Sequence, residues 1–187
     1  ELIIGPKKIK ENSRNGNSYN LQPTKFKVIT NSREIKELNV VSSGDFIIAS
    51  PINIGKLEIN MAGSGNILLE KKVGGNKLEI NLASSGSVVA SNIDLAGIEC
   101  SLAGSGYIQI AGKADRAEYN LAASGNIKAY ECVTGKTECN IAGSGNIQTH
   151  TRNQLEANIV GSGNVYYKGN PTTSKSIIGS GKLKSAN

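Results

Sequence analysis

Glutamates recur along this 187-residue chain about every 20 residues, and in most copies an asparagine follows two positions later. Carboxylate and amide oxygens bind hard cations such as Ca²⁺, and both groups can contact the hydroxyls of a sugar. A regular row of them on one surface is therefore a candidate binding face. Its residues are Glu58, Glu79, Glu99, Glu118, Glu138, Asn60, Asn81, Asn120 and Asn140.

The chemistry of these rows has several interpretations. Carboxylates on strands about 4.8 Å apart repel one another, so the glutamates would splay into water, pair with lysines or share cations. The asparagines could form an amide ladder that bonds from one strand to the next, or they could contact a sugar. The sequence predicts no cofactor and no resident metal.

A Ser-Gly pair repeats with the same period and indicates the architecture that positions these rows. The gaps between successive glycines run from 18 to 21 residues, which is typical of a solenoid whose corners absorb the variation. The pairs are Ser43-Gly44, Ser64-Gly65, Ser85-Gly86, Ser105-Gly106, Ser124-Gly125, Ser144-Gly145, Ser162-Gly163 and Ser180-Gly181.

Residues between the repeats alternate with period two, as in Leu57-Glu58-Ile59-Asn60-Met61, so each segment is a strand with one inward face. Such short strands pair in parallel with the equivalent strand of the next coil. The fold predicted is all-β: a single-stranded parallel β-helix, right-handed by the usual sense of parallel crossovers, with about eight coils and Gly-Ser-Gly-Asn turns. We expect aliphatic columns to fill the core and an alanine column, Ala62 to Ala142, to occupy its narrow corner.

Aromatic residues are scarce, with six tyrosines, two phenylalanines and no tryptophan. The alternation places Tyr107 and Tyr166 outward and Tyr167 inward. Because binding sites commonly combine aromatic and polar groups, Tyr166 joins the candidate binding face.

The three cysteines are expected to be reduced within the monomer. Cys100 and Cys139 share an inward column with Tyr119 between them, and two coils separate them by about 9.6 Å, beyond the roughly 7 Å that a disulfide spans. Cys132 lies in a connecting strand, and His150 is expected at the surface.

An enzyme of the pectinase-like polysaccharide lyase or hydrolase type is the alternative function. Such an enzyme needs acidic and basic residues that converge on one groove. Asp45, Asp94 and Asp115 lie in separate coils, and the repeat stays regular between them, so the sequence favours a non-catalytic protein.

The turns Gly63-Ser64-Gly65-Asn66 and Gly143-Ser144-Gly145-Asn146, each preceded by an alternating strand, resemble the head GIN domain family of auto-transporter adhesins, formerly a domain of unknown function. The resemblance covers residues 35–185. It implies a β-helix, a location in the envelope or on the surface of Gram-negative bacteria, and adhesion to a glycan or matrix ligand. It supplies no catalytic residues.

Charge and composition divide the chain into a basic leader or cap, residues 1–34, and a β-helix domain, residues 35–187. Residues 1–36 contain eight basic and three acidic residues, whereas the rest is nearly neutral, with 13 basic and 12 acidic. The basic excess in one end segment, with few aromatics, argues against nucleic-acid binding. No apolar run could span a membrane. We expect an exported, periplasmic or surface protein whose signal segment lies outside this sequence, and a monomer.

Deleting residues 1–34 is predicted to promote self-association. Residues 25–30 alternate like a strand and would cover the first coil, with Leu38 and Val40, whose open edge otherwise invites pairing. Light scattering and thermal unfolding of the full and shortened chains measure this. A shortened chain that stays monomeric and equally heat-stable would assign the basic leader to partner binding instead.

Overall fold

The computed structural model describes residues 35–41 and 43–186, and every regular element in them is a β-strand. The leader, residues 1–34, lies outside the described residues. The strand expected at residues 25–30, the division of the chain at residue 34 and the capping role therefore stay predictions.

Within these described ranges twelve strands form one sheet, and all of their pairings are parallel. They are β1 (Glu37–Val40), β2 (Phe46–Ile48), β3 (Ile52–Met61), β4 (Asn66–Leu69), β5 (Val73–Leu82), β6 (Ser87–Leu102), β7 (Tyr107–Leu121), β8 (Asn126–Gly143), β9 (Asn146–Gly161), β10 (Asn164–Lys168), β11 (Thr172–Gly179) and β12 (Lys182–Ser185).

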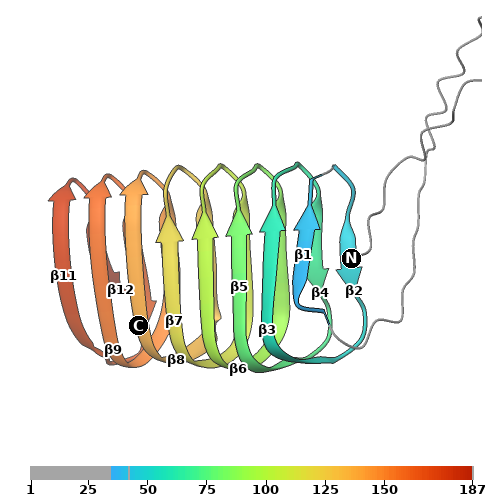
Figure 1. Ribbon diagram of the computed structural model, residues 1–187. Coiled ribbons are helices and arrows are strands. Elements are labelled where there is room, and N and C mark those ends of the chain that lie inside the picture. The colour runs from blue at the N-terminus through green and yellow to red at the C-terminus, as the bar shows by residue number, and fades with distance from the viewer. Residues whose placement is uncertain (1–34, 42, 187) are drawn as a thin grey trace, which may run out of the picture. The chain divides into compact units, whose positions relative to one another are not determined.

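The strands stack into a solenoid with two walls (Figure 1). The first wall consists of β1, β3, β5, the C-terminal halves of β6 to β9, and β11. The second wall consists of β2, β4, the N-terminal halves of β6 to β9, β10 and β12. The long strands β6 to β9 bend from the second wall into the first.

Like residues face like residues throughout the first wall. Glu37 pairs with Glu58, Glu58 with Glu79, and so on to Glu156, which pairs with Ser174 of β11. Eight stacked strands define seven turns between them, and the predicted parallel β-helix is confirmed. Its handedness stays a prediction.

The two corners between the walls differ in regularity. The first corner is the Gly-Ser-Gly turn. The second corner contains all the register shifts, which fall between Ala90 and Ile93, between Gln109 and Ala111, and in β8 after Ala129. The varying repeat length is therefore absorbed at the second corner, which leaves the first corner and both walls in register.

Glycine is required at the first corner because successive coils approach closely. A Cβ atom added at Gly106 would overlap the carbonyl oxygen of Gly86, although the backbone of Gly106 is not left-handed. At Gly125 a Cβ would lie 2.6 Å from the carbonyl oxygen of Gly106, closer than real Cβ contacts. The glycines after the turn serines thus let the backbones stack, and left-handed φ angles occur elsewhere, as at Gly75 (127°).

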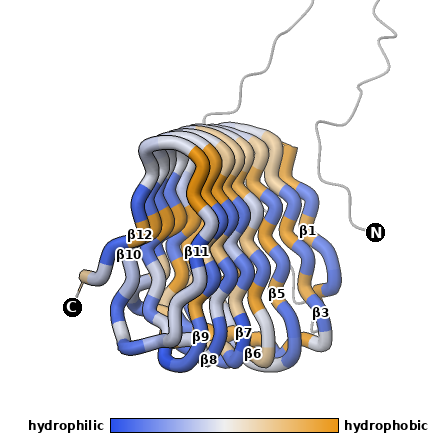
Figure 2. The backbone as a smooth tube through the Cα atoms, turned by 90° about the vertical axis from the view of Figure 1, so that its left-hand side faces the viewer, coloured by the Kyte–Doolittle hydropathy of each residue, from blue (hydrophilic) through white to orange (hydrophobic). Residues whose placement is uncertain are grey.

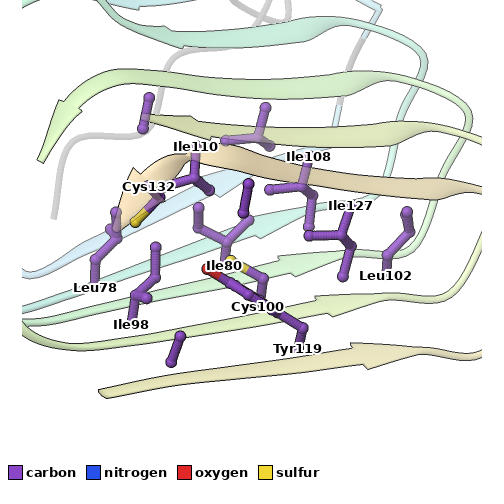
Figure 3. Packing of buried hydrophobic residues seen from close by; sticks show 14 of the residues in the cluster. Leu78, Ile80, Ile98, Cys100, Leu102, Ile108, Ile110, Tyr119, Ile127 and Cys132 are labelled. Carbon is purple, nitrogen blue, oxygen red and sulfur yellow. The ribbon is translucent and has the colours of Figure 1, made fainter. Parts of the chain in front are cut away.

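The core consists of aliphatic columns between the walls, and Figure 3 shows part of it around Ile80, Cys100 and Tyr119. All three cysteines are buried and free, as expected. Burial raises the pKa of the Cys132 thiol to about 11, which disfavours the reactive thiolate. The Tyr119 hydroxyl is buried without a hydrogen-bond partner among the described residues.

The prediction that an alanine column fills the narrow corner of the core is wrong. Ala62, Ala83, Ala103, Ala122 and Ala142 are all exposed. At its two ends the same column contains Val41 and Ile178, which are 79% and 69% exposed. The reason is the period of the strand: position 62 is two residues after Asn60 and shares its outward direction. Like hydropathy lines up along the rod in Figure 2.

The last coil differs in character from the coils before it. Lys175 stands opposite the buried Ala157 and is exposed, and Lys182 and Lys184 extend the second wall on β12. A charged side chain at an inward position opposes further strand pairing.

The glycine requirement predicts opposite results for two Gly→Ala variants. Gly106→Ala should destabilise the fold by about 3 kcal/mol, because a buried backbone carbonyl must move. Gly97→Ala should be neutral or stabilise by up to about 1 kcal/mol, because its Cβ would meet no atom within 4 Å. Denaturant unfolding measures both. Equal stabilities would show that the corner is not constrained by close approach.

Candidate functional site

The asparagines of the first wall form an amide ladder along the rod. Each side-chain nitrogen donates to the side-chain oxygen of the asparagine one coil earlier. The distances are 3.1 Å for Asn60 to Asn39, 2.9 Å for Asn81 to Asn60, 2.9 Å for Asn140 to Asn120 and 3.0 Å for Asn158 to Asn140.

The same nitrogens also donate to the glutamates of their own strand. Asn140 Nδ2 lies 3.0 Å from Glu138 Oε1, and Asn60 Nδ2 lies 3.0 Å from Glu58 Oε1. Both hydrogens of such an amide are therefore used inside the ladder. This arrangement stabilises the stack of coils and leaves the amide donors unavailable to a ligand.

Ser101 interrupts the ladder between Asn81 and Asn120. No side-chain hydrogen bond links it to either neighbour within residues 35–41 and 43–186. The ladder therefore consists of two segments, one on each side of Ser101.

Lysines neutralise the N-terminal part of the glutamate row. Lys56 Nζ lies 3.3 Å from Glu58 and 3.1 Å from Glu79, and Lys77 Nζ lies 2.8 Å from Glu99. The hydrogen bond from Lys56 holds the pKa of the Glu79 carboxyl below its usual value. Of the three arrangements that the sequence left open, lysine pairing is the one observed for these glutamates.

Glu118, Glu138 and Glu156, farther along the row, form no ion pair among the described residues and accept hydrogen bonds from their asparagines. No three His, Cys, Asp or Glu side chains converge in a way that would hold a metal ion within the described part of the chain. Whether the row binds a ligand stays a prediction.

Tyr166 does not join this row. It lies on β10 in the second wall, where it pairs in register with Gln148 and Lys184. The parity that placed it outward is right, because its neighbour Val165 is fully buried. Tyr166 was grouped with the ladder as an aromatic platform for a sugar, but it follows the turn and therefore lies on the second strand of its coil.

Three tyrosines of the second wall each have a lysine ammonium over the ring. Lys128 Nζ lies 4.8 Å from the centre of the Tyr107 ring. The corresponding distances are 4.8 Å for Lys168 on Tyr130 and 5.7 Å for Lys184 on Tyr166. The sequence signal for these pairs was a tyrosine and a lysine at outward positions, on neighbouring coils for Tyr107–Lys128 and Tyr166–Lys184 and two coils apart for Tyr130–Lys168.

A groove of about 500 Å³ at the second corner brings together charged residues from separate coils. Its lining includes Asp94, Lys113, Asp115 and Arg152. Asp94 is bridged by Lys72 at 3.0 Å and by Lys113 at 3.3 Å. Asp94 and Asp115 lie in separate coils, as expected, but both line this one groove because the corners of successive coils stack.

Buried threonines lie beside this groove, where the repeat pattern did not predict them. The Thr134 hydroxyl lies 2.6 Å from that of Thr137 and donates to the backbone oxygen of His150 at 3.0 Å. Thr137 and Thr151 are 2.7 Å apart. These hydroxyls satisfy one another at inward positions, where an aliphatic residue was expected. His150 itself is partly buried.

The amide ladder predicts that Ser101→Asn stabilises the protein by about 1–2 kcal/mol, because the introduced amide would join the two segments. Asn140→Ala should cost about 1–3 kcal/mol, since Asn120 and Asn158 lose their partner. Asn76→Ala, at an exposed position, is the control and should change little. Thermal and urea unfolding measure all three, and a neutral or destabilising Ser101→Asn would contradict the ladder.

The family model described as "Putative auto-transporter adhesin, head GIN domain" matches residues 1–73 and 66–171. The match includes residues 1–34, which the sequence resemblance did not cover. Among proteins with curated functional descriptions, none matches this chain.

Solved structures share the fold. A "putative lipid binding protein" from Parabacteroides distasonis is 52% identical, with a TM-score of 0.83 over 83% of this chain and 63% of its own. A "putative adhesin" from Parabacteroides merdae is 33% identical, with a TM-score of 0.77 over 81% of this chain and 64% of its own. Another from P. distasonis is 30% identical, with a TM-score of 0.79 over the same shares.

This chain thus spans less than two thirds of the length of these relatives. Within the described residues there is no helix that could cross a membrane. The family model, the repeated Gly-Ser-Gly turns and the shared solenoid together show that the chain belongs to the head GIN domain family.

Proposed function

We propose that this chain is a non-catalytic binding module of the cell envelope or surface, exported from the cytoplasm, that contacts an extended ligand along its walls. The observation that carries the proposal is the parallel, in-register stacking of the coils, which makes each wall a long rigid surface. A rigid surface with one strand every 4.8 Å or so suits a ligand that is itself long and repetitive.

The family supports this role, because its description names an adhesin, and two similar solved structures carry the same name. Adhesion needs a surface that resists deformation. The parallel register and the amide ladder provide that rigidity.

The alternative, a polysaccharide lyase or hydrolase, would use the groove at the second corner. Its general acid would need a pKa raised above the usual range. At Asp94 the shift has the opposite direction, because hydrogen bonds from Lys72 and Lys113 lower the pKa of the carboxyl. The two lysines hold Asp94 ionised, which suits an ion-pair role at the corner.

Lipid binding is a second candidate, since the relative with 52% identity is described as a "putative lipid binding protein". The exposed apolar column supports it, with Val160 54% and Ile178 69% exposed at one end. Most of the column is alanine, whose small apolar area gives little binding energy per residue.

An array of glycans, matrix proteins and lipids, probed with the intact 187-residue chain, tests the proposal. We expect binding to a glycan or matrix ligand, and no release of reducing ends or unsaturated products from acidic polysaccharides. Cleavage that is lost in Asp115→Asn would show that the groove is an active site. Binding to lipids alone would favour the second candidate.

A further inference from the structure

The second wall carries a surface of tyrosines and lysines that has no counterpart on the first wall. We name it the tyrosine–lysine surface. It extends over β7, β8, β9, β10 and β12, which are consecutive neighbours in the sheet. Its residues are Tyr107, Lys128, Tyr130, Tyr166, Lys168 and Lys184.

All six side chains point away from the core. They alternate along their strands with buried residues such as Ile108, Ala129 and Val165. Lys128, Lys184 and Tyr107 are exposed, and Tyr130, Tyr166 and Lys168 are partly buried. The tyrosines and lysines therefore share one outward face of the sheet.

The lysines on this surface are positioned by rings, whereas those of the first wall are neutralised by carboxylates. An ammonium that lies over an aromatic ring keeps its full positive charge. In the described residues Lys128 and Lys184 have no carboxylate within ion-pair distance, and Lys168 has one distant partner, the exposed Glu131 at 3.9 Å. On the first wall, Lys56 and Lys77 each contact two glutamates.

The surface also presents amides that the protein does not use. Gln109 and Gln148 lie in the same register column as Lys128 and Tyr166. Neither amide makes a side-chain hydrogen bond within the part of the chain that the structure describes. They contrast with the ladder asparagines, whose donors are occupied.

Free amides, tyrosine hydroxyls and unneutralised ammonium groups on a flat sheet match one ligand chemistry. The ammonium groups attract carboxylates or sulfates, and the amides and hydroxyls pair with sugar hydroxyls. The lysines cover the ring faces, so these rings are poorly placed to stack on nucleic-acid bases, which need an open face.

We propose that the tyrosine–lysine surface binds a linear acidic polysaccharide, with Lys128, Lys168 and Lys184 as the contacts for its anionic groups. The inference rests on the proposed binding function and assigns it a surface and a ligand class. The rings of Tyr107, Tyr130 and Tyr166 act as positioning residues that hold the ammonium groups in place.

Two triple variants of the full chain test this assignment. The first is Lys128→Gln, Lys168→Gln and Lys184→Gln. The control is Lys56→Gln, Lys77→Gln and Lys136→Gln. It removes the same number of positive charges from a single register column of the first wall. Thermal unfolding verifies that both fold.

Binding is measured by calorimetry with polygalacturonate as the carboxylate probe, chondroitin sulfate as the sulfated probe and dextran as the neutral one. We expect the wild type to bind at least one of the two acidic polymers, with an affinity that falls as salt rises, and not to bind dextran. The first triple variant should lose roughly tenfold in affinity, and the control less than about twofold.

Equal losses in the two variants would overturn the assignment, because they would show attraction by net charge alone. Preference for oligothymidylate or for phosphatidylglycerol vesicles over both acidic polymers would overturn the ligand class. If the chain binds another ligand on the array but neither acidic polymer, this inference is overturned and the proposed function stays intact. A chain that binds no ligand at all would contradict both.

Discussion

Close approach of backbones at the first corner is the constraint on which the rest of this molecule depends. The glycine after each turn serine lies against the carbonyl oxygen of the glycine one coil earlier, as Gly106 does against Gly86. Because no side chain fits between these backbones, each coil stacks on the preceding coil in a single register. The glutamates, asparagines and core aliphatics line up because this corner repeats without a shift.

The two walls use that register differently. On the first wall, amides and carboxylates bond to one another, and the result is a stable surface whose polar groups already have partners. On the second wall a short amide ladder links Asn126, Asn146 and Asn164 beside the first corner. Two residues farther along these strands, like-on-like stacking gives way to alternating chemistry at Lys128, Gln148 and Tyr166. The binding surface that we propose thus lies on the wall opposite the glutamate–asparagine ladder.

Much of the fold could be predicted from the sequence, since a period of two within each strand and of about 20 between coils defines a parallel solenoid. The alternation correctly placed Tyr107 and Tyr166 outward and Tyr167 against the core. It should also have placed Ala62 outward, and that error came from assuming that small apolar residues fill a corner.

What could not be predicted depends on three-dimensional neighbours. The meeting of Asp94 with Lys72 and Lys113 depends on how the irregular second corner stacks, where the register shifts. The buried Thr134 and Thr137 look like surface residues until their hydroxyls are seen to pair. Likewise, Tyr166 joins lysines rather than the ladder because the two strands of a coil face opposite ways.

Hydrogen exchange of side-chain amides, measured by NMR, is the most direct test of the central claim. That claim is that the amide donors of the first-wall ladder are bonded within the protein, whereas those of the tyrosine–lysine surface are open to a ligand. The account predicts slow exchange for Asn60, Asn140 and Asn158, whose amide nitrogens donate within the ladder, and exchange at the rate of free amides for Gln109 and Gln148. Equally fast exchange at all five residues would contradict it.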